Sequence, residues 1–127
     1  MTFLKPYENQ IYAGTRIVVG FMFFSHGVQK LMTIFGGGES QMPAALLWAT
    51  ALIETAGGGL IALGLQASLA AFICSGQMAV AYFLVHQKDG VLPIQNHGEL
   101  AALYAWIFLV ISVKGAGIWS FDGASKG

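Results

Sequence analysis

The chain has 127 residues, of which 56% are hydrophobic and only 9% are charged, and its formal net charge is zero at pH 7. Soluble domains ordinarily carry about 25% charged residues, so this composition indicates a membrane protein. The length fits a single domain, residues 1–127, and the charge balance excludes nucleic acid as a partner.

Four apolar segments approach the ~20 residues that cross a bilayer as a helix: 11–32, 44–65, 67–86 and 99–121. The first is longer than a signal-peptide core and contains charged residues, so we expect a retained span. Glycines and Pro43 separate the first two segments, and "QKDGVLPIQNHG" precedes the last. Because backbone groups inside a bilayer must bond internally, we predict an all-α bundle of four transmembrane helices, embedded in lipid, with both termini on one side.

The cations are distributed unevenly between the two predicted sides. The terminal side carries Lys5, Arg16, Lys114 and Lys126, and the other side carries Lys30 and Lys88. Following the positive-inside rule, we expect cytoplasmic termini in a cytoplasmic (inner) membrane of the bacterial type.

Cys74 is the only cysteine of the chain. This excludes an intramolecular disulfide, a Cys-x-x-C redox pair and a thiolate cage for zinc or an iron–sulfur cluster. We interpret Cys74 as a buried packing residue. We expect no covalent cofactor, and we assign no residues as metal ligands.

Ionisable side chains at membrane depth are costly and usually face the bundle interior, so each one marks a candidate site. On the first span, a sector about 120° wide holds Phe23 and the polar or small residues Arg16, Gly20, His26, Gly27 and Lys30. Glu54 on the second span lies about 15 Å from the same side as His26 and Lys30. A carboxylate in hydrocarbon must be protonated or find a partner, so we expect Glu54 beside Arg16, Lys30 or His26.

Further residues complete this candidate site. The glycines at 57–59 remove bulk beside Glu54, where a flat ring or a neighbouring helix can approach, and Gln77 offers a neutral hydrogen-bonding group at similar depth. Glu99 opens the fourth span on the His26 side. His86 ends the third span and, on a regular helix, projects about 180° away from Gln77.

Ordered motifs along the chain resemble those of the DoxX family of small four-helix membrane proteins. The first span carries "GTRIVVG" and "SHGVQKL", the second "IETAGGGLIALGL", and the last opens with "NHGELAALY" and closes with "GAGIWSFDG". Phe121 replaces the usual leucine, and Ile118 and Trp119 stand where the family often has an arginine. The resemblance covers nearly the whole chain and implies a four-helix membrane protein that works with redox systems.

The family includes relatives of quinone-reducing membrane subunits, and a quinone requires hydrogen-bond donors at its two carbonyls and a supply of protons. We therefore assign His26 as a donor, Lys30 or Arg16 as the group that stabilises negative charge, and Glu54 as the proton holder. The catalytic candidates are His26, Lys30 and Glu54, and the candidate quinone-binding residues are Arg16, Gly27, Gly58, Gln77 and Glu99. Since nothing in the chain delivers electrons, a partner oxidoreductase must donate them.

Other interpretations stay open at this stage. The same polar groups fit a non-catalytic scaffold or accessory subunit of an oxidoreductase complex, in which they only fix helix packing. Less favoured is a copper protein, with ligands from His26, His86 or His97 and from Met22, Met32 or Met42. Haem ligation by His26 and His86 is the least favoured interpretation of the histidines. A transporter would require an oligomer, built from identical or from different chains.

Overall fold

The computed structural model describes residues 1–126, and this part of the chain consists of helices and connecting turns, as predicted for an all-α protein. The elements are a 3-10 turn at Lys5–Tyr7, α1 (Glu8–Phe35), α2 (Ala44–Leu63), α3 (Ala67–Ala81), a π-helical turn at Tyr82–His86, a 3-10 turn at Gln87–Asp89, α4 (Pro93–Asn96), α5 (Glu99–Lys114) and α6 (Phe121–Lys126).

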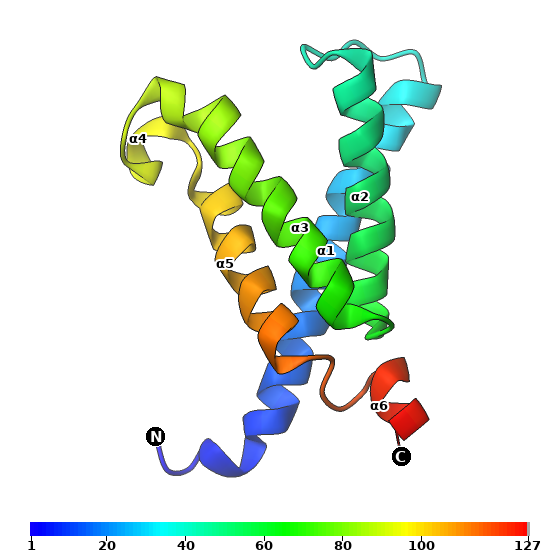
Figure 1. Ribbon diagram of the computed structural model, residues 1–127, viewed down its shortest axis with the longest axis vertical. Coiled ribbons are helices and arrows are strands. Elements are labelled where there is room, and N and C mark those ends of the chain that lie inside the picture. The colour runs from blue at the N-terminus through cyan, green and yellow to red at the C-terminus, as the bar shows by residue number, and fades with distance from the viewer. Residues whose placement is uncertain (127) are drawn as a thin grey trace.

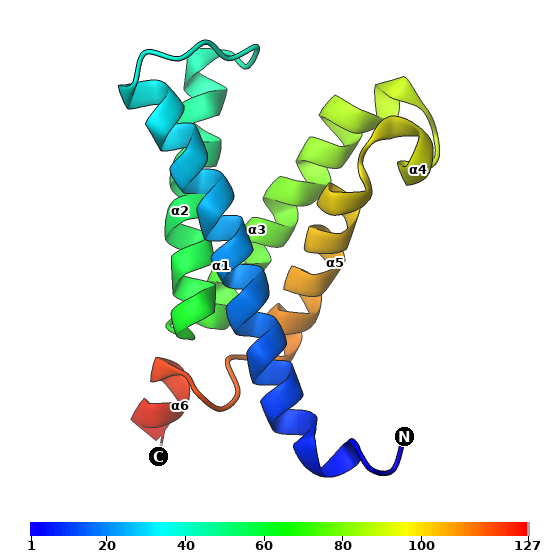
Figure 2. The same ribbon diagram turned by 180° about the vertical axis from the view of Figure 1, so that it is seen from behind.

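The long helices form two pairs. Figure 1 shows α1 beside α2 and α3 beside α5, with the pairs close together at the end that carries both termini and apart at the end that carries α4. The view from behind shows the same divergence (Figure 2). Both termini therefore lie at one end of the bundle, as the sequence predicted.

Three stretches in the described part of the chain are long and apolar enough to cross a membrane: Lys5–Phe35, Ala44–Leu63 and Ala67–Asp89. The predicted fourth span, 99–121, is too long, because α5 ends at Lys114 after 16 residues. At about 1.5 Å per residue it extends about 24 Å, less than the ~30 Å of a bilayer core. Gly115 and Gly117 adopt positive φ angles of 83° and 73°, which end the helix although the apolar sequence continues.

Glycines bring the backbones of α1 and α2 into direct contact. A Cβ atom added at Gly20 would lie 2.6 Å from the Ala62 nitrogen and 2.9 Å from the Gly58 carbonyl oxygen. Added Cβ atoms at Gly27 and Gly58 would collide with the backbone of the facing helix. Small residues allow this close approach, which is how membrane helices commonly pack in the absence of a hydrophobic driving force.

The shared core lies between the two pairs. Phe23 of α1 packs against Tyr104 and Phe108 of α5, with ring centroids 5.1 and 4.8 Å away. Cys74 is buried in this core, as predicted. Ser75 of α3 donates a hydrogen bond of 2.7 Å to the Ala105 carbonyl of α5. These contacts fix α1 and α3 on either side of α5.

Arg16 and the segment after α5 close the terminal end of the bundle. The Arg16 side chain is completely buried, and its two terminal nitrogens donate to four carbonyl oxygens, those of Ile61, Ala62, Ile118 and Trp119, at 2.8 to 3.1 Å. The Asp122 carboxylate accepts the backbone N–H groups of Gln66 and Ala67 at 3.0 and 3.1 Å and so caps the start of α3. The chain after α5 is thereby tied to α1, α2 and α3.

Candidate functional site

A buried polar cluster joins the two helix pairs. Lys30 of α1 forms an ion pair with the Oε2 atom of Glu54 on α2, and the Gln77 side chain of α3 donates to the same oxygen at 2.9 Å. The Glu54 side chain is only 3% exposed, and the Lys30 side chain is 28% exposed. Of the three partners expected for Glu54, the structure therefore selects Lys30, and it adds Gln77.

Three polar atoms near this cluster are buried without a partner among the described residues: the Gln77 carbonyl oxygen Oε1, the Tyr104 hydroxyl and the hydroxyl of Thr55, which follows Glu54 on α2. Nearly all buried polar groups in proteins form hydrogen bonds, because an unpaired one costs about 1 to 3 kcal/mol. The unpaired atoms give this region an unused capacity to donate and accept hydrogen bonds.

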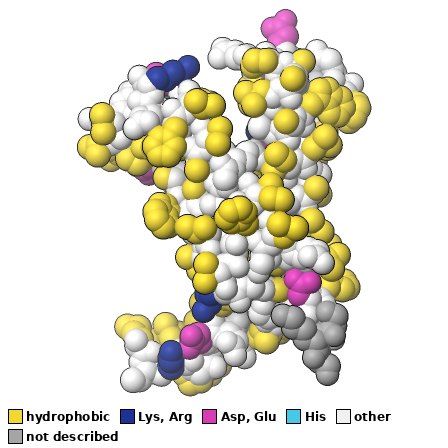
Figure 3. Space-filling model, in the orientation of Figure 1, with side chains coloured by type: hydrophobic (Ala, Val, Ile, Leu, Met, Phe, Trp, Pro, Cys, Tyr) yellow, Lys and Arg dark blue, Asp and Glu magenta, His cyan; other side chains and the backbone are white. Residues whose placement is uncertain are grey.

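The cluster borders a cleft of about 310 Å³ between the diverging helix pairs, and the space-filling view shows the hollow there (Figure 3). Its polar lining residues are His26, Lys30, Glu54, His86, His97 and Tyr104. The rest of the lining is apolar and includes Phe23, Met78 and Leu100. The cleft thus combines an apolar wall with a charged pair and several hydrogen-bonding side chains.

His26 lies at the edge of this cleft and does not pair with Glu54. Its ring meets the Tyr104 ring edge-on, with centroids 6.2 Å apart and planes at 90°. His26 is exposed, and its ring nitrogens form no hydrogen bond within the described chain. His26 and Glu54 therefore line the same cleft without pairing with each other.

Four of the predicted site residues lie away from the cleft. Arg16 is at the terminal end of the bundle, bonded to backbone carbonyls. Gly27 and Gly58 face the backbone of the neighbouring helix, so the glycines admit a helix where a flat ring was considered. Glu99 is exposed at the start of α5 and does not line the cleft.

Sequence reasoning missed three residues that line the cleft. Tyr104 was detectable as a hydroxyl at membrane depth on the fourth apolar segment. His97 was assigned to a loop, but the sequence did not predict that this residue lines the cleft. His86 was expected to point away from Gln77, and a π-helical turn, which the sequence pattern does not reveal, changes its direction.

Among the described residues, no three His, Cys, Asp or Glu side chains come together as a metal site. Of the methionines considered as copper ligands, Met42 lines the cleft, whereas Met22 and Met32 are exposed on α1. The three histidines considered with them, His26, His86 and His97, line the same cleft as Met42.

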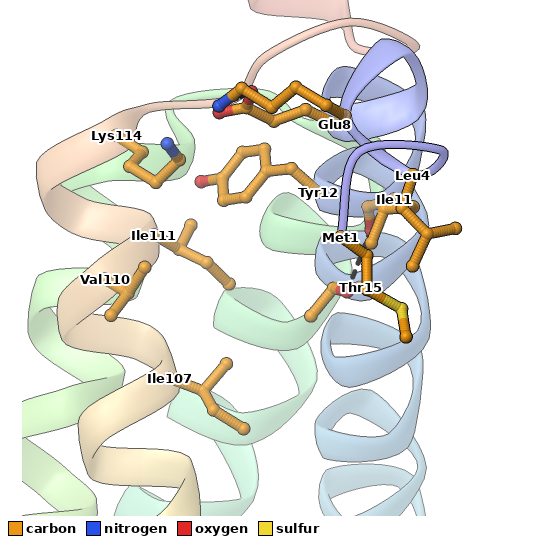
Figure 4. Close-up of a pocket in the computed structure, with 11 residues that line it drawn as sticks. Met1, Leu4, Glu8, Ile11, Tyr12, Thr15, Ile107, Val110, Ile111 and Lys114 are labelled. Carbon is orange, nitrogen blue, oxygen red and sulfur yellow. Dashed lines mark hydrogen bonds and ion pairs between the residues drawn. The ribbon is translucent and has the colours of Figure 1, made fainter.

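A larger groove of about 550 Å³ lies between the start of α1 and α5 (Figure 4). Apolar side chains form most of its wall, and its Lys5–Glu8 ion pair is exposed. Tyr12 donates to the Gly115 carbonyl at 2.6 Å, and the Lys114 ammonium lies 5.2 Å from the centre of its ring. Since these polar groups already have partners, the smaller cleft is the better candidate site.

An all-α chain of apolar helices with one buried ion pair defines a small helical membrane protein. The chain belongs to the DoxX family, whose match covers residues 12–87 and so includes Lys30, Glu54 and Gln77. An uncharacterized protein of Haemophilus influenzae is 38% identical over 128 residues, covering 96% of each chain. No solved structure matches the chain. Membership of the family confirms the resemblance seen in the sequence and makes this an integral membrane protein.

Proposed function

We propose that this protein is a quinone-binding membrane subunit of a redox system and that a partner oxidoreductase supplies its electrons. One observation carries the proposal: a nearly buried carboxylate, Glu54, is held by Lys30 and Gln77 at the wall of a cleft that is otherwise largely apolar. Ionisable groups at membrane depth are costly, so a cluster of them that borders a cleft favours a functional role.

The chemistry of the cleft suits a quinone head group, which is a flat apolar ring with two carbonyl oxygens. When bound, a quinone accepts two electrons and two protons. The cleft volume of about 310 Å³ is at the lower limit of small-molecule sites, which usually span about 300 to 1,000 Å³. The unpaired Tyr104 hydroxyl and the His26 ring offer donors, and Phe23 and Met78 offer apolar surface.

Each residue of the cluster has a distinct role in this proposal. The Lys30 ammonium stabilises negative charge in the cleft, where the low dielectric strengthens its effect. Glu54 holds a proton or a negative charge, and Gln77 orients the carboxylate through its 2.9 Å hydrogen bond. His26 donates a hydrogen bond from the edge of the cleft.

The charge distribution supports one orientation of the bundle. Lys5, Arg16 and Lys114 belong to the terminal half and Lys30 and Lys88 to the half with α4. We place the termini on the cytoplasmic side on this basis, so that the cleft opens toward the opposite face.

A non-catalytic scaffold is the second candidate. It is favoured by the fact that Glu54 bonds to residues of both helix pairs, so that the same cluster can fix how the pairs pack. In that case the variants that break the cluster change stability, and quinone content does not change with them.

The proposal is tested by measuring quinone in the purified protein and its binding of decylubiquinone in lipid nanodiscs. We expect quinone near stoichiometry in the unmodified chain and decylubiquinone binding that is about tenfold weaker in Glu54→Gln, since this variant removes the charge that positions the Lys30 ammonium, and a hydrogen bond from a charged donor to the quinone contributes about 1.5 to 3 kcal/mol. Glu99→Gln makes the same chemical change at an exposed position outside the cleft and should bind like the unmodified chain. Thermal unfolding of each variant verifies its fold, and equal affinities in the two variants would overturn the proposal.

A further inference from the structure

His86 lines the cleft because of an irregularity in the third helix. It is the last residue of the π-helical turn Tyr82–His86, which directly continues α3. A π turn takes in about one residue more than an α turn, so it shifts the direction of the side chains that follow it. This shift turns His86 toward the cleft, beside Ala81 and Val85, although a regular helix would direct it away from Gln77.

The hydrogen bond of His86 fixes which nitrogen carries its proton. The Nδ1 atom lies 3.1 Å from the backbone carbonyl oxygen of Asn96. A carbonyl oxygen can only accept, so Nδ1 must carry a hydrogen. In the neutral ring, Nε2 is then unprotonated and has a free lone pair. Nε2 forms no hydrogen bond within the described chain.

The carbonyl that accepts the His86 hydrogen bond belongs to Asn96, the last residue of α4. Asn96 is 1% exposed, its amide nitrogen donates to the Tyr82 hydroxyl at 3.2 Å and the Gly90 carbonyl at 3.0 Å, and its side-chain oxygen accepts the Gly98 N–H at 2.8 Å. With every side-chain polar atom of Asn96 engaged, its backbone carbonyl is a fixed anchor for the imidazole.

The position of His86 connects water with the cleft. It is half-buried, and the next residues in the chain, Gln87, Lys88 and Asp89, are exposed at the α4 end. The ionisable and polar groups that share the cleft with it come from every neighbouring element: His26 and Lys30 from α1, Glu54 from α2, Tyr104 from α5 and His97 from the loop after α4.

We propose that His86 exchanges protons between the aqueous surface at the α4 end and a ligand oxygen in the cleft. This inference rests on the proposed function, in which the partner oxidoreductase supplies the electrons. In the charged ring the Nε2–H bond breaks and its electron pair stays on Nε2, while the proton passes to the ligand oxygen. The other proton stays on Nδ1, hydrogen-bonded to the Asn96 carbonyl, throughout, and a proton from the aqueous surface then returns to Nε2.

The variant His86→Asn tests this role with little change in structure, because an asparagine amide can donate to the Asn96 carbonyl but does not titrate. His97→Asn is the matched control: His97 lines the same cleft and has a positive φ of 59°, a conformation that asparagine tolerates. Decylubiquinone affinity in nanodiscs is measured from about pH 5 to pH 8, the range in which an imidazole ordinarily takes up a proton.

We expect the unmodified chain and His97→Asn to bind decylubiquinone about tenfold more tightly at the acid end of the range, because a charged donor then faces the ligand oxygen. His86→Asn should lose most of this pH dependence and keep only the part that His26, the other donor in the cleft, contributes. A pH dependence of full size in His86→Asn, or binding by the unmodified chain that does not change with pH, would overturn this inference while leaving the proposed function intact. No binding at any pH would overturn both.

A spectroscopic measurement tests the same inference without any ligand. In ¹⁵N-histidine-labelled protein, NMR distinguishes the two neutral tautomers, and the signal lost in His86→Asn identifies His86. We expect a protonated Nδ1 and a bare Nε2 in the neutral form. A neutral ring with the proton on Nε2 would contradict the inference, whatever the binding data show.

Discussion

Each end of the bundle buries one cation, but the two cations have different partners. At the terminal end, Arg16 donates to four backbone carbonyls that belong to α2 and to the segment after α5. At the α4 end, Lys30 pairs with one carboxylate, Glu54, which Gln77 also binds. The first arrangement uses backbone groups of the fold itself, whereas the second uses side chains from three helices.

The two ends also differ in what they leave unpaired. Around Arg16, the carbonyls at the end of α2 and after α5 are occupied, Tyr12 and Asp122 add further bonds to the backbone, and the Arg16 Nε atom is the polar atom buried there without a partner in the described chain. Around Glu54, the Tyr104 hydroxyl and one oxygen of Gln77 have no partner in the described chain. Because the unpaired atoms of the Glu54 end lie beside a cleft, this difference agrees with the proposal that a ligand binds there, whereas the backbone bonds of Arg16 hold the fold together.

The largest effect on stability is expected from Arg16→Met. The change leaves four carbonyls without donors at a completely buried position, and we expect a loss of about 3 to 5 kcal/mol, close to the stability of a small domain. The yield of monodisperse protein and the unfolding temperature in nanodiscs measure this loss. Lys5→Met, which removes a cation from an exposed ion pair, is the control and should unfold like the unmodified chain. Normal unfolding of Arg16→Met would show that this cation does not hold the fold together.

A smaller loss is expected where the backbones of α1 and α2 touch. Gly20→Ala places a Cβ atom 2.6 Å from the Ala62 nitrogen, so the helices must separate, at a cost of about 2 to 3 kcal/mol. Gly14→Ala is the control on the same helix, because nothing lies within 4 Å of its added Cβ atom. It should be neutral, or stabilising by about 0.5 to 1 kcal/mol through helix propensity. Equal unfolding temperatures in the two variants would contradict the close packing.

The Lys30–Glu54 pair should give a still smaller effect on stability. Lys30→Met leaves a nearly buried carboxylate without its cation, which we expect to cost about 1 to 2 kcal/mol, since Lys30 is partly exposed. Adding Glu54→Met removes the stranded charge and should restore stability to within about 1 kcal/mol, because an apolar pair can replace a buried ion pair. Quinone binding should remain weaker in the double variant than in the unmodified chain. A double variant that is less stable than Lys30→Met would instead assign the pair to packing.

The starts of α2 and α5 could be predicted from the sequence because they depend on local signals. Pro43 precedes α2, which begins at Ala44, and Gly98 precedes α5, which begins at Glu99, both as expected. The end of α5 could not be found in this way, since hydropathy continues past Lys114 while Gly115 turns the chain. Mean hydropathy depends only on the side chains, so it does not reveal a helix end that is set by the backbone conformation.

The charged pair of the candidate site was predictable, but most of the residues around it were not. Lys30 and Glu54 were expected to face inward because of the cost of charge in lipid. Arg16 shares the face of Lys30, but 14 residues of helix, about 21 Å, separate them, and a view along the helix axis hides that distance. Which glycine meets a helix and which meets a ligand depends on how neighbouring helices cross, and a single sequence does not contain this information. The direction of His86 could not be predicted either, because it depends on the π turn Tyr82–His86, which the sequence pattern does not reveal.

The smallest effect on stability is expected from Tyr104→Phe, and it compares the two ends directly. The Tyr104 hydroxyl is buried without a partner, so its removal should leave stability unchanged or raise it by up to about 1 kcal/mol. Tyr12→Phe removes a hydroxyl that donates to the Gly115 carbonyl, and it should lower stability by about 1 kcal/mol. Decylubiquinone affinity should follow the opposite order, falling about fivefold in Tyr104→Phe, which loses a donor to the ligand, and staying constant in Tyr12→Phe. If both variants destabilised the protein equally and neither changed affinity, the Tyr104 hydroxyl would have a partner within the folded chain, and the contrast between the two ends would disappear.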